Sequence, residues 1–298
     1  MNKRWLTAGC MASLLLLTGF AWAQGTEQPR LSGAFDYTGK PLLETALKND
    51  NYFAHRFGID LFDIDYELGL DSYMQYLESG QERNPNHRAD IFARMGLICI
   101  YALPDRDSKR AQEYFAQAIE AAEPDYFSRH LYMARTNYAA FLRGYEERFE
   151  TFLALAQWLG SIDEAMVRRS LGIERNPNEV VARNTDIDTG EVREIRRSEA
   201  DEWLLETYDK SANDRVRLLL EPVERYLNDR LPENCVESAM YTEKPVASMQ
   251  RLVEETAGTP VAAYAETQMH RAETAQQMRE MGEELLRQQQ EEAEQQEQ

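Results

Sequence analysis

The chain has 298 residues, and its 33 Lys and Arg stand against 52 Asp and Glu, which gives a formal net charge of −19 at pH 7. This acidity excludes a nucleic-acid-binding protein, because phosphate recognition needs clustered basic residues, and it disfavours an anionic membrane surface as partner. Only 15 Gly and 10 Pro are present, which favours helices over a sandwich or barrel with its frequent turns.

The first 23 residues have the pattern of a secretory signal peptide. Lys3-Arg4 forms a positive start, residues 6–20 are apolar, and Ala21-Trp22-Ala23 is a small-residue cleavage site. The apolar run is too short to be a good membrane span. Cleavage removes two basic residues and no acid, leaving 31 basic and 52 acidic residues and a charge of −21. We therefore expect a periplasmic protein with no stable membrane insertion after signal cleavage.

Residues 24–40 are rich in Gly, Pro and polar residues and predict a flexible lead, after which Pro41 suits a first helical turn. From about residue 50 the chain repeats itself. Residues 56–59 recur as 94–97, and a second shift of similar size maps Phe115 onto Phe152. A period of two helices is typical of helical-hairpin repeats, whose neighbours must stack to bury their apolar faces.

The middle copy of the repeat is the clearest. It predicts a first helix over 93–101, a turn over 103–108 and a second helix over 109–118. Small and aromatic residues alternate along one face of the second helix, and small Ala lets the paired helix come close. The residues of that face are Ala111, Phe115 and Ala118.

This pattern resembles tetratricopeptide repeats, and the Sel1-like subclass in particular, over about residues 50–158. The residues that carry the resemblance are Gly96, Tyr101, Asp107, Lys109, Ala111, Phe115 and Ala118. Leu103-Pro104 stands where the family has a glycine after the tyrosine, and Arg148 stands in the third copy where a small alanine is expected. The resemblance implies a curved superhelix whose concave face binds peptides or proteins.

The second half of the chain predicts a β-hairpin and further helices. The hairpin runs through about 180–196, with Gly190 at positive φ in its turn. Helices are expected over 153–171 with Ser161 as a cap, from Ser198 onward, over 213–231 with a bend or break at Pro222, over 245–257, and after Thr259-Pro260. Residues 288–298 contain only Gln, Glu and one Ala, a composition that predicts a solvated, frayed tail.

We therefore predict an all-α fold: a tetratricopeptide-like helical-hairpin solenoid followed by further helices, with one small β-hairpin insertion near 180–196. The expected organisation is a signal peptide (1–23), a flexible lead (24–40), a helical repeat domain (41–175), a β-hairpin insertion (176–197), a C-terminal helical region (198–287) and a Gln/Glu-rich disordered tail (288–298).

The sequence contains no catalytic, cofactor or metal motif: G-x-S-x-G, H-E-x-x-H and phosphate-binding glycine loops are absent. We therefore assign no catalytic residue, cofactor or metal ligand. Residues 60–71 hold the densest acidic cluster, which we interpret as a solvated helix edge with Leu61, Phe62 and Ile64 turned inward. Its members are Asp60, Asp63, Asp65, Glu67 and Asp71. Asn184, Asp186 and Asp188 resemble a calcium loop, but a hairpin turn explains them more simply.

Two cysteines remain after signal cleavage, Cys99 and Cys235. An oxidising compartment permits a disulfide between them. The alternative is a buried free thiol at Cys99, because residues 96–101 are apolar nearly throughout.

These observations favour an exported scaffold or adaptor whose partner is another envelope protein or peptide, with the concave face of residues 50–158 as the binding site. Tyr73, Tyr132 and Tyr145 are candidate partner contacts, since tyrosine combines large contact area with low entropy cost; the alternative for each is core packing. Two other hypotheses stay open: an envelope hydrolase with an acidic cleft, and a structural protein that self-associates through its last helix.

Overall fold

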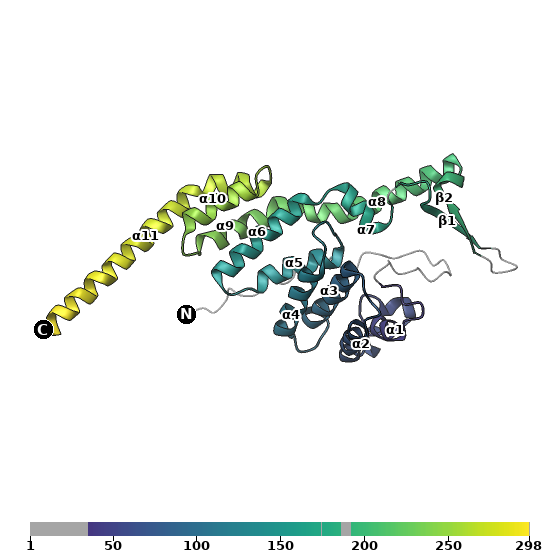
Figure 1. The fold of residues 1–298 in the computed structure, drawn as a ribbon, viewed down its shortest axis with the longest axis horizontal. Helices are drawn as coiled ribbons and strands as arrows, with labels where there is room; N and C mark the ends of the chain where they lie inside the picture. The colour runs from purple at the N-terminus through teal and green to yellow at the C-terminus, as the bar shows by residue number, and fades with distance from the viewer. Residues whose placement is uncertain (1–34, 174, 186–191, 298) are drawn as a thin grey trace, which may run out of the picture. The chain divides into compact units, whose positions relative to one another are not determined.

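The computed structural model describes residues 35–173, 175–185 and 192–297 (Figure 1). Within these ranges the chain is built of α-helices with one two-stranded antiparallel sheet, which confirms the predicted all-α fold with one small β-hairpin. The predicted signal peptide, most of the predicted flexible lead, and the hairpin turn with Asp186, Asp188 and Gly190 lie outside the described residues.

Eleven α-helices, three short 3-10 helices and two strands occupy the described ranges. In chain order they are α1 (Pro41–Lys48), η3 (Ala54–Phe57), η4 (Leu61–Asp63), α2 (Tyr66–Glu78), α3 (Pro85–Tyr101), α4 (Ser108–Ala121), α5 (Arg129–Phe141), α6 (Tyr145–Ser161), α7 (Glu164–Leu171), β1 (Val180–Thr185), β2 (Val192–Arg196), η5 (Arg197–Glu199), α8 (Glu202–Asp229), α9 (Leu231–Met240), α10 (Pro245–Glu255) and α11 (Pro260–Glu297).

Side-chain caps explain where many of these helices begin. Asn84, Asp107 and Ser128 accept hydrogen bonds from the first-turn amides of α3, α4 and α5, which satisfies donors that have no partner inside the helix. Asp163 and Asp201 do the same for α7 and α8. The prediction of Ser161 and Ser198 as helix N-caps is wrong. The observed N-caps, Asp163 and Asp201, lie two and three residues further along the chain.

Helices α3 and α4 form the pair that the middle repeat predicts. Ala111, Phe115 and Ala118 are fully buried. The Phe115 ring packs on Gly96 so closely that a Cβ there would lie 2.4 Å from the ring, so only glycine admits this contact. Both α3 and α4 pack on α5, and α5 packs on α6. Successive helix pairs therefore stack in this region.

The predicted first repeat copy is wrong in its alignment. Residues 54–57 form a 3-10 turn, and Gly58 ends it with a left-handed φ of 70°. Gly96, its supposed equivalent, lies inside α3. The first helix pair is instead α1 with α2, so the short motif shared by 56–59 and 94–97 has two different backbone conformations.

The C-terminal helices pack mainly on one another and on α6. Helix α9 contacts α6, α10 and α11, and α10 contacts α11 along its length. Pro222 lies inside α8 without dividing it, and Pro232 stands in the first turn of α9 rather than ending a helix, where its missing amide is not needed. Gly258 ends the helix before it with a φ of 82°, as predicted.

Helix α11 continues through Glu297, so the predicted frayed tail is helical over the described residues. Glu and Gln are good helix formers, which explains this outcome without any packing partner. The side chains of residues 288–291 are exposed. The solvated part of that prediction therefore holds where the side chains are described.

The predicted hairpin is confirmed in the described residues. Strand β1 pairs with β2 in a register that sets Thr185 opposite Val192 and Val180 opposite Arg196, with an irregularity between Val180 and Ala182. Strand β1 also contacts α8, which supplies the support that an isolated hairpin needs.

Both described cysteines are free and fully buried, so the candidate disulfide is not formed. Cys99 lies on α3 beside Arg110 of α4, whereas the Cys235 thiol donates to the Phe152 carbonyl at 3.6 Å. Burial raises the pKa of both thiols. Each cysteine is thus a small apolar packing residue in its own helix pair.

One apolar cluster of buried side chains runs from Phe35 to Ala272 and connects the N-terminal and C-terminal helices. Among the described residues, no helix combines the length and apolar character that crossing a bilayer requires.

Candidate functional site

The three tyrosines predicted as partner contacts have three different environments. Tyr73 is fully buried, and its hydroxyl donates to Asp50 at 2.9 Å, so its interpretation as an exposed contact is wrong. Tyr132 packs edge-on against Tyr226 of α8, with ring centres 6.4 Å apart. Only Tyr145 is largely exposed, at 56%, and it stacks on Tyr241. The structure therefore does not bring the three together.

The acidic cluster of residues 60–71 serves the local backbone and surface. Asp60 and Asp65 cap η4 and α2, and Glu67 pairs with Arg110 at 2.8 Å. The described residues contain no group of three or more His, Cys, Asp or Glu placed to hold a metal ion. The prediction that Leu61 and Phe62 turn inward is wrong: they are 58% and 97% exposed, because the capped turn directs them to solvent.

Asp50 and Arg94 form a buried ion pair between the segment after α1 and helix α3. The Arg94 guanidinium donates to both Asp50 oxygens, one of them at 3.0 Å, and lies over the Tyr52 ring at 4.9 Å. Burial and the Asp50 carboxylate raise the pKa of Tyr73 well above its usual value. This network satisfies its own charges inside the core.

Asp90 is the second buried acid of this region. Its carboxylate accepts hydrogen bonds from Tyr126, at 2.7 Å, and from Ser128. Burial raises the pKa of Asp90 to about 6, although the two hydroxyl donors oppose that shift. Asp90 thereby joins α3 to the segment that starts α5, and its role is structural.

A groove of about 600 Å³ lies between α7 and α8. Along α8, the lining residues are alternately three positions and one position apart, and this spacing places them on one face of the helix. The α7 wall is formed by two residues that are four positions apart. The lining residues are Glu164, Arg168, Arg175, Asn213, Val216, Arg217, Leu220, Glu221 and Glu224. Three arginines, three glutamates and two aliphatic side chains therefore share one groove.

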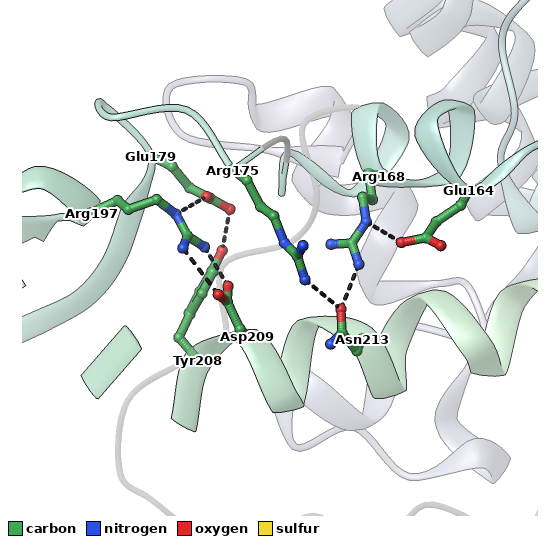
Figure 2. Close-up of polar contacts among 8 residues, drawn as sticks. All are labelled: Glu164, Arg168, Arg175, Glu179, Arg197, Tyr208, Asp209 and Asn213. Carbon is green, nitrogen blue, oxygen red and sulfur yellow. Dashed lines mark hydrogen bonds and ion pairs between the residues drawn. The ribbon is translucent and has the colours of Figure 1, made fainter. Parts of the chain in front are cut away.

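Two arginine side chains converge on one neutral atom at the end of this groove, as Figure 2 shows. Arg168 and Arg175 each donate through Nη2 to Oδ1 of Asn213, the latter at 3.1 Å. Arg168 Nε also donates to Glu164 at 2.6 Å. An amide oxygen carries no net charge, so Asn213 holds two like charges side by side without neutralising either of them.

Each of these two arginines has one unusual feature: Arg168 has an unpaired donor, and Arg175 has a strained backbone. Nη1 of Arg168 is buried and has no hydrogen-bond partner within the described part of the chain. Arg175 has a left-handed backbone with a φ of 58°, and it is the one non-glycine residue with positive φ among those described. Such a conformation costs free energy in a residue with a Cβ, and such strain is most common at functional sites.

A fully paired cluster stands beside the groove and ties the hairpin to α8 (Figure 2). Arg197 donates to Glu179 at 2.9 Å and to both oxygens of Asp209, and Tyr208 donates to Glu179 at 2.8 Å. The hydrogen bond from Arg197 lowers the pKa of Asp209, with smaller contributions from Arg175 and Arg168. This cluster fixes Glu179, four residues after Arg175, beside α8.

Sequence reasoning missed the groove because its parts are far apart along the chain. Asn213 lies 45 residues from Arg168 and 38 from Arg175. One signal was present: Arg168, Arg169 and Arg175 are three basic residues within eight positions of a strongly acidic chain.

Comparison with protein-family models, with curated proteins and with solved structures finds no match to this chain.

Proposed function

We propose that this protein is an exported helical scaffold that holds another protein or peptide of the cell envelope in the groove between α7 and α8. The observation that carries the proposal is the pair of guanidinium groups, Arg168 and Arg175, that meet on the neutral oxygen of Asn213. A buried donor without a partner is costly in a folded chain, and a bound ligand removes that cost.

The location of the site differs from the one that the repeat pattern favours. The resemblance to tetratricopeptide repeats predicts that a partner binds the concave face of residues 50–158, whereas the groove begins at Glu164. In this proposal the stacked helices α1–α6 are the framework, and α7, α8 and the hairpin form the binding end. The signal-peptide pattern of residues 1–23 supports export.

Site-specific photo-crosslinking tests the binding function. A photoreactive phenylalanine analogue replaces Leu220, which lines the groove, or Leu218, which is exposed on the same helix and outside the groove lining. We expect a discrete adduct in intact cells from position 220 and none from position 218. An equal yield from both positions, or none from either, contradicts the proposal.

The export part of the proposal has its own test. Cell fractionation and N-terminal sequencing of the purified protein should find it in the periplasmic fraction with Gln24 as its first residue. A protein that retains residues 1–23 in the cytoplasmic fraction contradicts export and leaves the groove proposal untouched.

A further inference from the structure

We infer that the groove binds a peptide carboxylate between Arg168 and Arg175, with the rest of the peptide extended along α8. The inference rests on the proposed function, because it names the chemistry of the ligand that the same groove would hold. It goes further by specifying the anion, its position and the side chains that should accompany it.

The charge around Asn213 favours a bound anion. Two guanidinium groups that share one neutral acceptor repel each other, and an anion between them turns that repulsion into attraction. Nη1 of Arg168 is buried and makes no hydrogen bond in the described structure, so an anion that reaches it replaces no existing bond. Guanidinium groups match the two oxygens of a carboxylate in geometry as well as charge.

The charges that line the groove favour a singly charged anion. Glu164, Glu221 and Glu224 line the groove together with its three arginines, so the lining carries no formal net charge. Asp209 is close enough for Arg175 and Arg168 to lower its pKa. A phosphate dianion would meet more repulsion here than a carboxylate, since it brings a second negative charge.

The other end of the groove is apolar and then acidic. Val216 and Leu220 follow Asn213 along the α8 wall and offer an apolar contact. Glu221 is already paired with Arg225, at 3.3 Å, but Glu224 has no side-chain ion pair within the described residues. At a rise of 1.5 Å per residue, Glu224 lies about 16 Å along α8 from Asn213.

An extended chain covers about 3.3 Å per residue. A peptide of about five residues therefore spans the groove, with its carboxylate at Arg168 and Arg175, an apolar side chain over Val216 and Leu220, and a basic side chain at Glu224. Figure 2 shows the arginine end of this path, with Arg175 and Arg168 directed at Asn213.

Calorimetry with the full processed protein and synthetic peptides tests the inference. The probe is acetyl-Lys-Ala-Ala-Leu-Ala with a free C-terminal carboxylate, and its control is the same peptide as the C-terminal amide. We expect the amide to bind at least about 10-fold more weakly, because hydrogen bonds to charged groups contribute about 1.5–3 kcal/mol. A third peptide, acetyl-Lys-Ala-Ala-Leu-Glu-amide, distinguishes a side-chain carboxylate from a terminal one.

Protein variants complete the experiment. Arg168→Gln and Arg175→Gln should each weaken binding of the free-acid peptide by at least about 10-fold, and Glu224→Gln should weaken it by a smaller factor. Arg271→Gln is the matched control: Arg271 is exposed on α11, outside the groove lining, and its loss should leave the affinity unchanged.

Three results overturn the inference: equal binding of acid and amide peptides, no binding of any carboxylate peptide at millimolar concentration, or displacement of the peptide by an equal concentration of inorganic phosphate. If the adduct from position 220 persists in cells while these results hold, only the carboxylate assignment fails. If the adduct is also absent, the proposed function fails with it.

Discussion

Arg94 and Arg168 are buried to a similar degree, with 7% and 12% of their side chains exposed, yet their surroundings differ. Arg94 meets the fully buried carboxylate of Asp50 and the face of Tyr52. Arg168 meets the mostly exposed Glu164 and a neutral oxygen that it shares with Arg175. The first arginine completes a core, and the second leaves a donor open.

In the proposed function, this difference separates structural charges from binding charges more clearly than burial does. A buried ion pair whose hydrogen bonds are satisfied stabilises only when both partners are present. In the proposed function, a cation whose donors are not all paired gains less from folding and keeps a donor for a ligand. The predictions below test that distinction, first in the region of α3–α5 and then in the groove.

Arg94→Met should have the largest effect on stability. It leaves the Asp50 carboxylate buried without its cation, and breaking one side of a buried pair costs about 3–5 kcal/mol. Urea denaturation followed by circular dichroism measures the free energy of unfolding. The double variant Asp50→Asn/Arg94→Met should recover part of the loss, and a single variant as stable as the wild type would refute the assigned role.

Asp90 should give the protein a pH-dependent stability. Its pKa rises from its ordinary 3.8 to about 6 in the folded state, a difference worth about 3 kcal/mol. The folded state therefore holds this proton more tightly than the unfolded state does. The resulting contribution of Asp90 to the free energy of unfolding is fully present below about pH 4 and is lost as the pH rises through 6.

The measurement is the free energy of unfolding between pH 4 and 7 for the wild type and for Asp90→Asn. The difference between the two isolates Asp90 from the other acids of the chain. We expect the wild type to lose stability relative to the variant as pH rises, and parallel curves would contradict the assignment.

Gly96→Ala should cost about 1–3 kcal/mol, the usual range for overpacking a core. The new Cβ meets the Phe115 ring at 2.4 Å, and that ring is fully buried. Thermal unfolding measures the loss. Gly282→Ala, at a position with open space around it, is the matched control and should be neutral or slightly stabilising.

Reduction should have the smallest effect. Because Cys99 and Cys235 are free, a reducing agent should leave the melting temperature of the processed protein unchanged. A thiol reagent should label neither cysteine in the folded protein within minutes and both after denaturation. A fall of several degrees on reduction would show that a disulfide forms in the oxidised protein.

Local features were predictable from the sequence because local chemistry determines them. Three features depend on residues that are close in the sequence: the buried face of α4 formed by Ala111, Phe115 and Ala118, the end of the helix before Gly258, and the hairpin. The alignment of residues 56–59 with 94–97 failed for the opposite reason: a four-residue motif with two identical positions, Arg and Gly, does not fix a backbone when Gly58 can adopt a left-handed conformation.

The groove and the buried pair depend on long-range contacts that a single sequence does not reveal. Asp50 and Arg94 are 44 residues apart in the sequence. Tyr73 is a core residue, and its hydroxyl donates a hydrogen bond to the same Asp50. The convergence of Arg168 and Arg175 on Asn213 arises only when α7 packs beside α8. The net charge of the chain gave no indication of a groove in which three arginines stand beside three glutamates.

The central claim is that the arginines of the groove serve binding rather than folding. The double variant Arg168→Gln/Arg175→Gln tests it when urea unfolding and titration with the free-acid peptide are measured on the same preparation. We predict a free energy of unfolding within about 1 kcal/mol of the wild type, together with loss of peptide binding. A loss of stability as large as that of Arg94→Met, or undiminished peptide binding, would contradict the claim.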